Sequence, residues 1–502
     1  RYARWIEDKG RRETWVETVQ RYTDYLHSKG INLTGQDWDD IEGAILELEV
    51  MPSMRALMTA GVAADRDNTC IYNCSYVAVD HPRAFDEAMF ILLCGTGVGF
   101  SVERQAISQL PEIPNTLGQS EDVIAVQDSK EGWAKALRKL ISLLYTGDIP
   151  KWDLDKIRPA GSRLKTFGGR ASGPEPLNDL FNFVVAKFKG AMGRKLNSIE
   201  CHDIMCKIGE VVVVGGVRRS AMISLSNLSD TRMAHAKSGS WWENEKQRAL
   251  ANNSACYTEK PDSETFLREW LALVESKSGE RGIFSRVAAE AHVAKNGRRE
   301  TGYAWGTNPC SEIILRSNQF CNLTEVVVRE TDDLASLKRK VRLATILGTA
   351  QATFTHMPYL RPIWTKNTEE ERLLGVSLTG IMDHPVLGKN VDSPKWLAEM
   401  KQVAIDTNAE YAERLGIEVS AAITCVKPSG TVSQLVDSAS GIHARHSDHY
   451  IRTVRGDNKD PLTQFLKDAG IPAEADVMKP DATTVFSFPT KSPMSAVTRN
   501  AM

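Results

Sequence analysis

From about residue 70 onward, short runs rich in strand-forming residues alternate with amphipathic helical patterns. The strand-like runs are 70–79, 98–103, 210–216, 220–226, 311–316, 324–330, 421–427 and 449–455. Between them lie helical patterns at 82–95, 262–277 and 334–354. Strands that alternate with helices over this length are typical of an α/β fold with a largely parallel sheet.

The first 60 residues differ from the rest, because helical patterns dominate them. Residues 11–30 place Trp15, Val19, Tyr22 and Leu26 at helical spacing, and a second helix is expected over 37–51, before Pro52. No linker divides the remainder, so we expect a helical region at 1–60 and one large catalytic domain at 61–502. The last residues, 492–502, are typical of a helix that has only begun, and we expect the natural chain to be longer.

Composition excludes several classes of protein. The chain has 62 Lys and Arg against 64 Asp and Glu, which argues against direct nucleic-acid binding or a membrane-surface role. No segment reaches the roughly 20 apolar residues of a membrane span, and no secretory signal is visible. The nine cysteines are dispersed and odd in number. We therefore expect a reducing compartment, the cytoplasm of a bacterium or of a virus-infected cell.

The stretch GTNPCSEIIL, Gly306 to Leu315, carries an amide, a thiol and a carboxylate at alternate positions. In an extended chain, Asn308, Cys310 and Glu312 would share a face at spacings of roughly 6–7 Å. Pro309 disfavours a regular central strand, so a loop or a strand end is expected. Such groups could act together on a polyol, with the carboxylate as general base and the thiol as nucleophile or hydrogen-atom donor. A structural cysteine beside a surface glutamate is the alternative.

Other short motifs indicate a function only when they are taken together. Cys321 follows in FCNLTE, Cys70 and Cys74 lie in NTCIYNCSY, and KPSGTVSQL forms a small-residue loop able to present N–H groups to a phosphate. We expect no metal site at the histidines of GIHARHSDHY or at the cysteines of SIECHDIMC, whose spacing fits packing better. The glycines of CGTGVGF precede a strand rather than a helix, so a dinucleotide fold is rejected.

Together these motifs resemble the catalytic subunit of ribonucleotide reductases, most closely the class II, adenosylcobalamin-dependent ribonucleoside-triphosphate reductases. The resemblance runs from RRETW to YIRTVRG, nearly the whole chain. Its most specific part is N-P-C-x-E-I, followed eleven residues after the cysteine by C-N-L-x-E. The family's fold implies a ten-stranded α/β barrel whose central loop carries the radical cysteine.

The resemblance also implies a role for each matching residue. Cys310 matches the thiyl-radical cysteine that takes hydrogen from C3′ of the ribose. Glu312 matches the base toward the 3′-hydroxyl, and Asn308 the amide that binds the substrate hydroxyls. Cys74 and Cys321 match the pair that reduces the 2′ position and ends as a disulfide, with Cys70 as the fallback for Cys74.

Further positions match binding loops. The phosphate-binding loop corresponds to Pro428, Ser429, Gly430, Thr431, Val432 and Ser433, and substrate-contacting positions to Ser53 and Ser75. The loop linking the specificity effector to the substrate base corresponds to Gly215, Gly216, Val217, Arg218, Arg219 and Ser220, with Arg158–Pro174 as a neighbouring effector segment. An ordinary Gly/Arg-rich turn is the alternative for both effector segments.

The resemblance implies adenosylcobalamin as cofactor, a ribonucleotide substrate, a deoxynucleotide effector and a thioredoxin-like reductant. The cysteine pair that family members carry in a C-terminal tail is not seen near Met502. Three alternatives stay open from the sequence. A class I subunit would need no cofactor in this chain and would receive its radical from a separate metal-bearing subunit. A hydrolytic cysteine enzyme would use Cys310 as nucleophile, although no histidine lies nearby in sequence. The third is a nucleotide-binding protein without catalysis.

Overall fold

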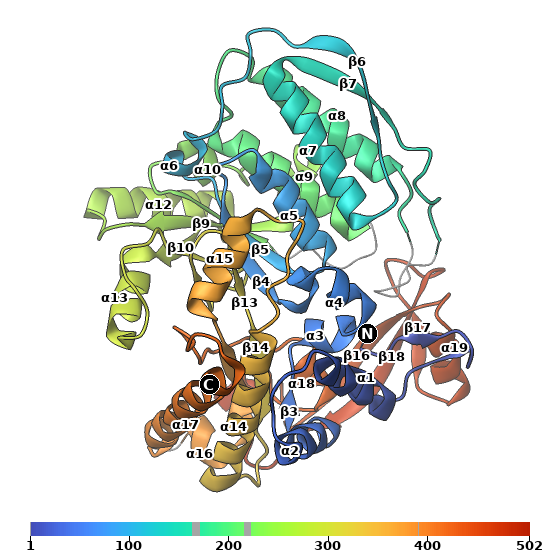
Figure 1. Ribbon diagram of the computed structural model, residues 1–502, viewed down its shortest axis with the longest axis vertical. Coiled ribbons are helices and arrows are strands. Elements are labelled where there is room, and N and C mark those ends of the chain that lie inside the picture. Colours follow the sequence, from blue (N-terminus) through green and yellow to red (C-terminus); the bar gives the residue numbers. More distant parts are fainter. Residues whose placement is uncertain (1, 163–170, 215–221, 390, 502) are drawn as a thin grey trace. The chain divides into compact units, whose positions relative to one another are not determined.

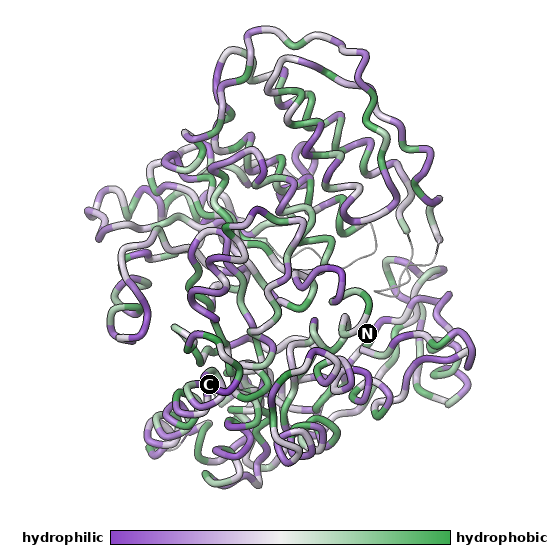
Figure 2. The backbone as a smooth tube through the Cα atoms, viewed as in Figure 1, coloured by the Kyte–Doolittle hydropathy of each residue, from purple (hydrophilic) through white to green (hydrophobic). Residues whose placement is uncertain are grey.

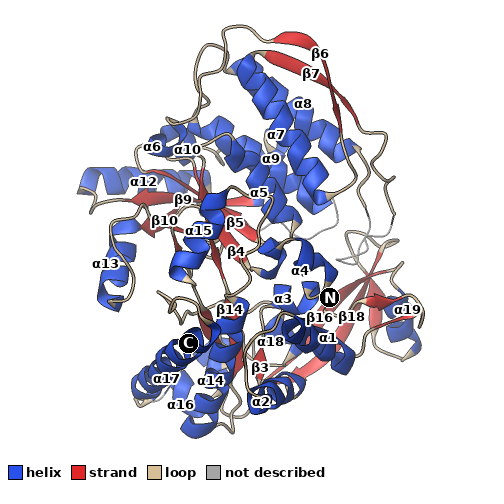
Figure 3. Cartoon of the chain, viewed as in Figure 1, coloured by secondary structure: helices blue, strands red, loops and turns tan. Residues whose placement is uncertain are grey.

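The computed structural model describes residues 2–162, 171–214, 222–389 and 391–501. The chain forms two compact units. Unit 1 comprises 1–325, 342–376 and 404–425, and unit 2 comprises 326–341, 377–403 and 426–502. The division expected at residue 60 stays a prediction. Figures 1 and 3 show the helices and strands described below.

The N-terminal part of unit 1 is mainly helical, in agreement with the sequence pattern. Its two main helices, α1 (Trp15–Ser28) and α2 (Gly35–Leu46), each begin with a capping box, from Thr14 to Glu17 and from Thr34 to Asp37. The short elements around them are β1 (Trp5–Ile6), β2 (Arg11–Arg12), β3 (Val50–Met51), α3 (Met54–Thr59), α4 (Val62–Arg66) and η1 (Asn68–Ile71).

A six-stranded sheet forms the centre of unit 1, with the strand order β10-β9-β8-β5-β4-β13. Its first five strands are parallel, and β13 is antiparallel to β4. The strands are β4 (Cys74–Ala78), β5 (Gly97–Ser101), β8 (Met222–Asn227), β9 (Ala251–Tyr257), β10 (Gly282–Ser285) and β13 (Gln319–Cys321). The α/β class with a largely parallel sheet is therefore confirmed.

Four long helices of unit 1 pack against one another: α5 (Arg83–Leu93), α7 (Lys130–Thr146), α8 (Glu175–Gly190) and α9 (Ser198–Val214) (Figure 1). A two-stranded ribbon of β6 (Gly118–Ala125) and β7 (Asp148–Asp153) accompanies them. The strand predicted at 210–216 is wrong, because residues 210–214 form the end of α9. Packing of Val211 and Val212 into the core outweighs the strand preference of valine.

Further elements surround the sheet and form unit 2. In unit 1 these are α6 (Arg104–Ile107), α10 (Thr231–Ala234), α11 (Trp241–Asn244), η2 (Lys246–Leu250), α12 (Ser263–Ser276), α13 (Arg286–Asn296), β11 (Gly306–Thr307), β12 (Ile314–Leu315) and α15 (Pro362–Glu371). Residues of both units make up β14 (Leu323–Val327), α14 (Leu334–Gln351), β15 (Gly375–Thr379) and α17 (Ser393–Leu415). Unit 2 adds η3 (Ile381–Asp383), α16 (Pro385–Lys389), α18 (Val432–Leu435), β16 (His449–Asp457), α19 (Pro461–Asp468), β17 (Ala473–Ala475), β18 (Thr483–Lys491) and η4 (Arg499–Ala501).

The described strands do not close into a barrel. Besides the six-stranded sheet there are two three-stranded sheets, β15-β14-β3 and β16-β18-β17, and three two-stranded ones. Of the predicted strands, 421–427 contributes only an isolated bridge at Thr424, and 449–455 pairs antiparallel with β18. Figure 2 shows hydrophilic and hydrophobic colours alternating along the helices, as expected of amphipathic elements. No described helix combines the length and apolarity needed to cross a bilayer.

Candidate active site

The GTNPCSEIIL stretch is a β-hairpin. Its strands β11 and β12 pair antiparallel, with Gly306 opposite Leu315 and Thr307 opposite Ile314. Residues 308–313 form the loop between them, as expected from Pro309. The loop turns sharply because Ser311 has a positive φ of 67° and donates its N–H to the carbonyl of Asn308 at 2.9 Å. Cys310 therefore lies at the tip of a tight turn.

Asn308 organises this loop through both ends of its amide. Its Nδ2 donates to Oε2 of Glu312 at 2.7 Å, and its Oδ1 accepts the N–H of Ile313 at 3.0 Å. The spacing expected for an extended chain is wrong, since the turn at Ser311 brings the amide and the carboxylate into direct contact. The amide thus fixes one oxygen of the candidate base beside the turn that carries the thiol.

Cys310 differs from the other cysteines in its exposure. Its side chain is exposed, whereas seven of the other eight cysteines are buried and Cys425 is half-buried. Cys310 is therefore the cysteine whose sulfur is most open to an approaching molecule. The hairpin tip thus presents an exposed thiol.

Close backbone approach seats the hairpin on the central sheet. A Cβ at Gly306 would lie within 2.0–2.3 Å of the ring atoms of Tyr76 on β4. A Cβ at Gly99 on β5 would lie 1.8 Å from the carbonyl oxygen of Thr307. Only glycine leaves room for the neighbouring atoms at these two positions, so the hairpin lies directly against β4 and β5.

A partly buried ion pair anchors the residue just before the hairpin. Nε of Arg286 donates to the carbonyl of Trp305 at 2.9 Å, while its Nη2 binds Glu103 at 2.7 Å. The indole of Trp305 donates to Glu290. Burial raises the pKa of Glu103, but the hydrogen bonds and charge of Arg286 outweigh burial, so the pKa lies below its ordinary value. Glu103 is therefore ionised and holds the guanidinium in place.

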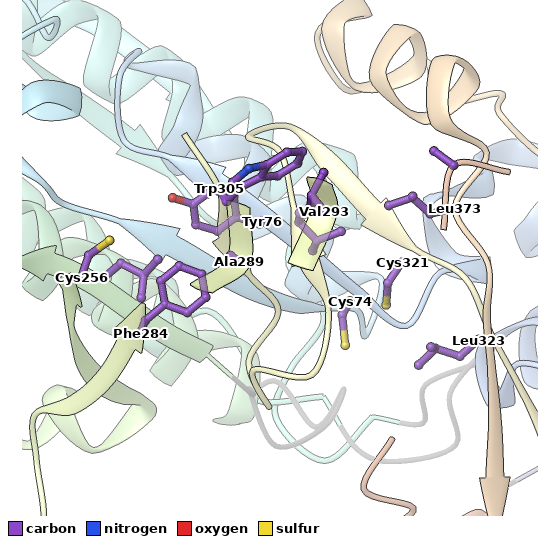
Figure 4. Packing of buried hydrophobic residues seen from close by; sticks show 13 residues of the cluster. Cys74, Tyr76, Cys256, Phe284, Ala289, Val293, Trp305, Cys321, Leu323 and Leu373 are labelled. Atoms are coloured by element: carbon purple, nitrogen blue, oxygen red, sulfur yellow. The ribbon is translucent and has the colours of Figure 1, made fainter. Parts of the chain in front are cut away.

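Cys74 and Cys321 are directly opposite each other in the sheet. In the antiparallel pair of β4 and β13, Cys321 is the register partner of Cys74. Opposite residues of such a pair have Cα atoms about 4.5–5.5 Å apart and side chains on one face. This separation lies within the roughly 4.4–6.8 Å range of disulfides. Figure 4 shows the two sulfurs on neighbouring strands, turned to the same side.

Cys70, the fallback for Cys74, lies elsewhere. It belongs to η1, is fully buried, and its thiol donates to the carbonyl of Asp67 at 3.3 Å. Burial raises the pKa of its thiol. The strand register thus favours Cys74 over Cys70 as the partner of Cys321.

Ser53 and Ser75 are buried and have partners within the protein. Ser53 caps α3 and donates its hydroxyl to Oδ1 of Asn73 at 2.7 Å. Ser75 follows Cys74 on β4 and donates to the carbonyl of Gly97 at 3.0 Å. Their predicted contact with substrate stays a prediction.

The Pro428–Ser433 loop belongs to unit 2 and is cross-linked internally. Ser433 donates its N–H to Oγ of Ser429 at 3.1 Å and its hydroxyl to the carbonyl of Ser429 at 2.7 Å. Gly430 is exposed, and no atom lies within 4 Å of the place where its Cβ would be. The helix that follows, α18, is a single turn of four residues.

Two predictions concern the effector and metal sites. The predicted effector residues Gly215–Ser220 lie outside the described residues, as does part of the 158–174 segment. Within the described ranges, no group of three or more His, Cys, Asp or Glu could hold a metal ion. His443 instead contacts the carbonyl of Ser440 through Nδ1 at 3.0 Å.

The groups that position the hairpin were missed by reasoning from the sequence. Gly99 belongs to the GTGVG run, whose pattern suggests only the dinucleotide motif rejected above. Its role follows from the close approach of Thr307, which a single sequence does not reveal. Glu103, Arg286 and Trp305 were missed as well, because nothing in one sequence links residues 183 positions apart.

Comparison with known proteins gives three kinds of similarity. Residues 106–186 match the insertion domain of B12-dependent ribonucleotide reductase. These residues include the last two residues of α6, all of β6, α7 and β7, and the first part of α8.

Relatives match over nearly the full chain. The protein named adenosylcobalamin-dependent ribonucleoside-triphosphate reductase of Lacticaseibacillus paracasei is 29% identical, covering 98% of this chain and 78% of that protein. The one of Lactobacillus leichmannii is 28% identical with the same coverage. The one of Euglena gracilis is 28% identical, covering 97% of this chain and 69% of its own length.

Solved structures share the fold. A crystal structure of a B12-dependent (class II) ribonucleotide reductase superposes with a TM-score of 0.81 at 24% identity, covering 99% of this chain and 82% of that one. The α subunit of the class Id ribonucleotide reductase of Actinobacillus ureae gives a TM-score of 0.53 at 13% identity, covering 93% and 77%.

Proposed function

We propose that this chain, a homologue of the adenosylcobalamin-dependent ribonucleotide reductases along nearly its whole length, reduces ribonucleotides to 2′-deoxyribonucleotides. The resemblance to this family expected from the sequence is confirmed. The observation that carries the assignment of roles is the register pairing of Cys74 with Cys321. Two cysteines from segments 247 positions apart in sequence face each other at a disulfide-compatible separation.

Each of the three hairpin residues has its own role in the reaction at the ribose. Cys310, as a thiyl radical, takes the hydrogen atom from C3′, which re-forms its S–H bond and leaves the radical on carbon. Glu312 accepts the proton of the 3′-hydroxyl as general base. Asn308 already holds one oxygen of that carboxylate at 2.7 Å, and in this function it also binds the substrate hydroxyls.

The cysteine pair supplies the electrons. One thiol protonates the departing 2′-hydroxyl, which leaves as water, and the two sulfurs then close a disulfide while the 2′ carbon gains hydrogen. The overall change is one ribonucleotide and one dithiol to one deoxyribonucleotide, one disulfide and one water. The hydrogen first taken from C3′ returns from Cys310, so this thiol ends as the radical that began the cycle. A thioredoxin-like dithiol would then reduce the pair by exchange.

The radical source we propose is adenosylcobalamin, which supplies when bound the one-electron chemistry that converts the Cys310 thiol to a thiyl radical. The structure is consistent with this cofactor because Cys310 is exposed at a hairpin tip, where a bulky group can approach it. The fold of class I relatives is less similar, so a separate radical-generating subunit is not favoured.

Other predicted features belong to this function. Pro428–Ser433 would bind the substrate phosphates, Ser53 and Ser75 would contact the substrate, and Gly215–Ser220 would transmit a deoxynucleotide effector. The ten-stranded barrel remains part of the proposal: one residue, Asn322, separates β13 of the six-stranded sheet from β14 of a second sheet. Dithiol chemistry of this kind fits a reducing compartment, and we expect the cytoplasm.

The test is turnover by the purified chain with adenosylcobalamin, dithiothreitol, a mixture of ribonucleotides and no second protein. We expect deoxyribonucleotides from the wild type and none from Cys310→Ala, with Cys425→Ser as the cysteine control that retains activity. Product formed only after a metal-bearing subunit is added would establish the class I alternative. Cofactor-independent hydrolysis that Cys310→Ala abolishes would establish a hydrolytic enzyme instead.

A further inference from the structure

A single arginine joins the Cys310 hairpin to the strand that carries Cys321. Arg299 lies between α13 and β11 and is buried. Its Nη1 donates to the carbonyl of Ile314 on β12 at 2.8 Å, and its Nη2 donates to Oε1 of Gln319 on β13 at 3.1 Å. One planar group therefore makes hydrogen bonds to both strands.

The two strand positions that Arg299 contacts lie close in sequence to the candidate catalytic residues. Ile314 follows Glu312 of the hairpin loop by two residues, and Gln319 precedes Cys321 by two. Because side chains alternate along a strand, Gln319 and Cys321 lie on the same face of β13. A displacement of the guanidinium would therefore act on the candidate base and on the cysteine pair at the same time.

Glu371 on α15 holds this guanidinium in one orientation. Its Oε1 accepts from Nε of Arg299 at 2.8 Å, and its Oε2 accepts from Nη2 at 2.7 Å, which makes a two-pronged pair. The carboxylate also accepts from the side-chain amide of Gln319. Burial raises the pKa of Glu371, but the hydrogen bonds and charge of Arg299 outweigh burial, so the pKa lies below its ordinary value. Glu371 is therefore ionised in the folded chain.

The indole of Trp305 packs against the same guanidinium. Cζ of Arg299 lies 4.5 Å from the ring centroid of Trp305, within the range of a cation–π contact. Trp305 directly precedes β11, and it belongs to the same cluster of buried residues as Cys74 and Cys321 (Figure 4). Arg299 thus contacts the hairpin segment twice, just before β11 and on β12.

A buried salt bridge of this kind is a poor source of stability. Removing both charges from water costs about as much free energy as their attraction supplies, so apolar residues of similar volume often stabilise a core equally well. Apolar residues do not provide direction, however. The fork of N–H donors on an arginine binds acceptors only at fixed positions in its plane. The contribution of this pair therefore lies in the geometry that it fixes.

We propose that Arg299, oriented by Glu371, is a positioning residue that sets the distance between the hairpin tip and the reducing cysteine pair. The inference rests on the proposed function, in which one ribose must meet the radical sulfur and the reducing sulfurs in turn. Arg299 acts through the carbonyl of Ile314 and the side chain of Gln319. Without these contacts the hairpin and β13 would move independently, and the two kinds of sulfur would no longer reach the same sugar.

The experiment compares Arg299→Lys with Arg281→Lys, a matched change in a second buried arginine. Arg281 also makes a two-pronged pair, with Glu269 at 2.8 and 2.6 Å. It donates as well to the carbonyls of Asn227 and Leu228, neither of which belongs to the hairpin or to β13. Lysine keeps the positive charge but does not reproduce the fork. Both variants should therefore lower the urea midpoint of unfolding by a similar amount.

Only Arg299→Lys should lower kcat for deoxyribonucleotide formation, by about 100-fold, which is the cost of a ~1 Å misplacement. KM for the ribonucleotide should stay within about 3-fold, because the change removes no contact with bound substrate. Glu371→Asp keeps the charge but draws the carboxylate back by one methylene, so it should lower kcat as well and replaces Arg299→Lys if that variant does not fold. Wild-type kcat in a folded Arg299→Lys, or equal losses in the two arginine variants, would overturn the proposal.

A measurement without turnover separates this proposal from the proposed function. In a Cys425→Ser background, the exposed thiol of Cys310 is labelled with bromotrifluoroacetone, whose fluorine NMR signal reports the surroundings of the hairpin tip. The signal should shift or split in Arg299→Lys and keep its wild-type position in Arg281→Lys. If the wild type reduces no ribonucleotide, the proposed function fails, and this signal decides the role of Arg299. A signal that Arg299→Lys leaves unchanged would overturn that role.

Discussion

Gly99 offers a direct way to test whether the sheet positions the Cys310 hairpin. In Gly99→Ala, the new Cβ would lie 1.8 Å from the carbonyl oxygen of Thr307 and 3.0 Å from its carbonyl carbon. Both are backbone atoms and cannot rotate away. The third neighbour, Cγ2 of Ile223 at 3.2 Å, blocks movement to the other side. The hairpin must therefore shift away from β5.

The size of the shift follows from this distance. Real Cβ atoms essentially never approach another atom within 3.0 Å, so the gap of 1.8 Å must open by at least about 1.2 Å. A misplacement of ~1 Å in a catalytic group costs about 100-fold in rate. Overpacking of this kind also lowers the free energy of unfolding by about 1–3 kcal/mol, which a protein of this size can tolerate.

The assay is kcat for deoxyribonucleotide formation, measured with thermal unfolding of the same preparation. We expect Gly99→Ala to fold and to lose about 100-fold in kcat. The control is Gly118→Ala on β6, where nothing lies within 4 Å of the new Cβ, and it should keep wild-type kcat. Wild-type kcat in a folded Gly99→Ala would refute the claim that β5 fixes the hairpin.

Two further predictions concern the cysteine pair and the anchoring ion pair. Cys321→Ser and Cys74→Ser should each lower dithiol-driven turnover more than ~100-fold. Cys70→Ser should keep turnover within about 10-fold of the wild-type value, because its hydroxyl keeps the hydrogen bond to Asp67. A larger loss in Cys70→Ser than in Cys74→Ser would make Cys70 the partner of Cys321. Glu103→Gln should lower the free energy of unfolding by ~3–5 kcal/mol, because it leaves the mostly buried guanidinium of Arg286 without its counter-charge. The matched change Glu264→Gln, in an exposed pair, should cost under ~1 kcal/mol in urea unfolding. Since the folded pKa of Glu103 lies below its ordinary value, its contribution is complete above about pH 4.5 and is lost as pH falls through the folded pKa. Equal acid sensitivity of wild type and Glu103→Gln would contradict this reasoning.

Some features could be predicted from the sequence because local chemistry determines them. Alternating strand and helix patterns indicated the α/β class, and Pro309 correctly indicated a loop around Cys310. The N-terminal helices were recognisable from the spacing of residues such as Val19 and Tyr22, which are buried. The spacing of N-P-C-x-E-I and C-N-L-x-E led to the family that the relatives support.

Long-range packing accounts for what could not be predicted. The valines at 211–214 favour a strand locally, yet they continue a helix because Cys201, Ile204 and Ile208 share its buried face. The contact of Asn308 with Glu312 depends on the positive φ of Ser311, which no residue preference signals. The pairing of β4 with β13 depends on the whole sheet, so the register of Cys74 and Cys321 appears only in the structure.

The measurement closest to the central claim is a single turnover without external reductant. The fully reduced chain, loaded with adenosylcobalamin and excess ribonucleotide, is quenched, and its deoxyribonucleotide and disulfide-linked peptides are counted together. We predict about one deoxyribonucleotide per chain and one new disulfide joining Cys74 to Cys321, with neither formed by Cys310→Ala. Product formed while Cys74 and Cys321 stay as thiols would contradict the account.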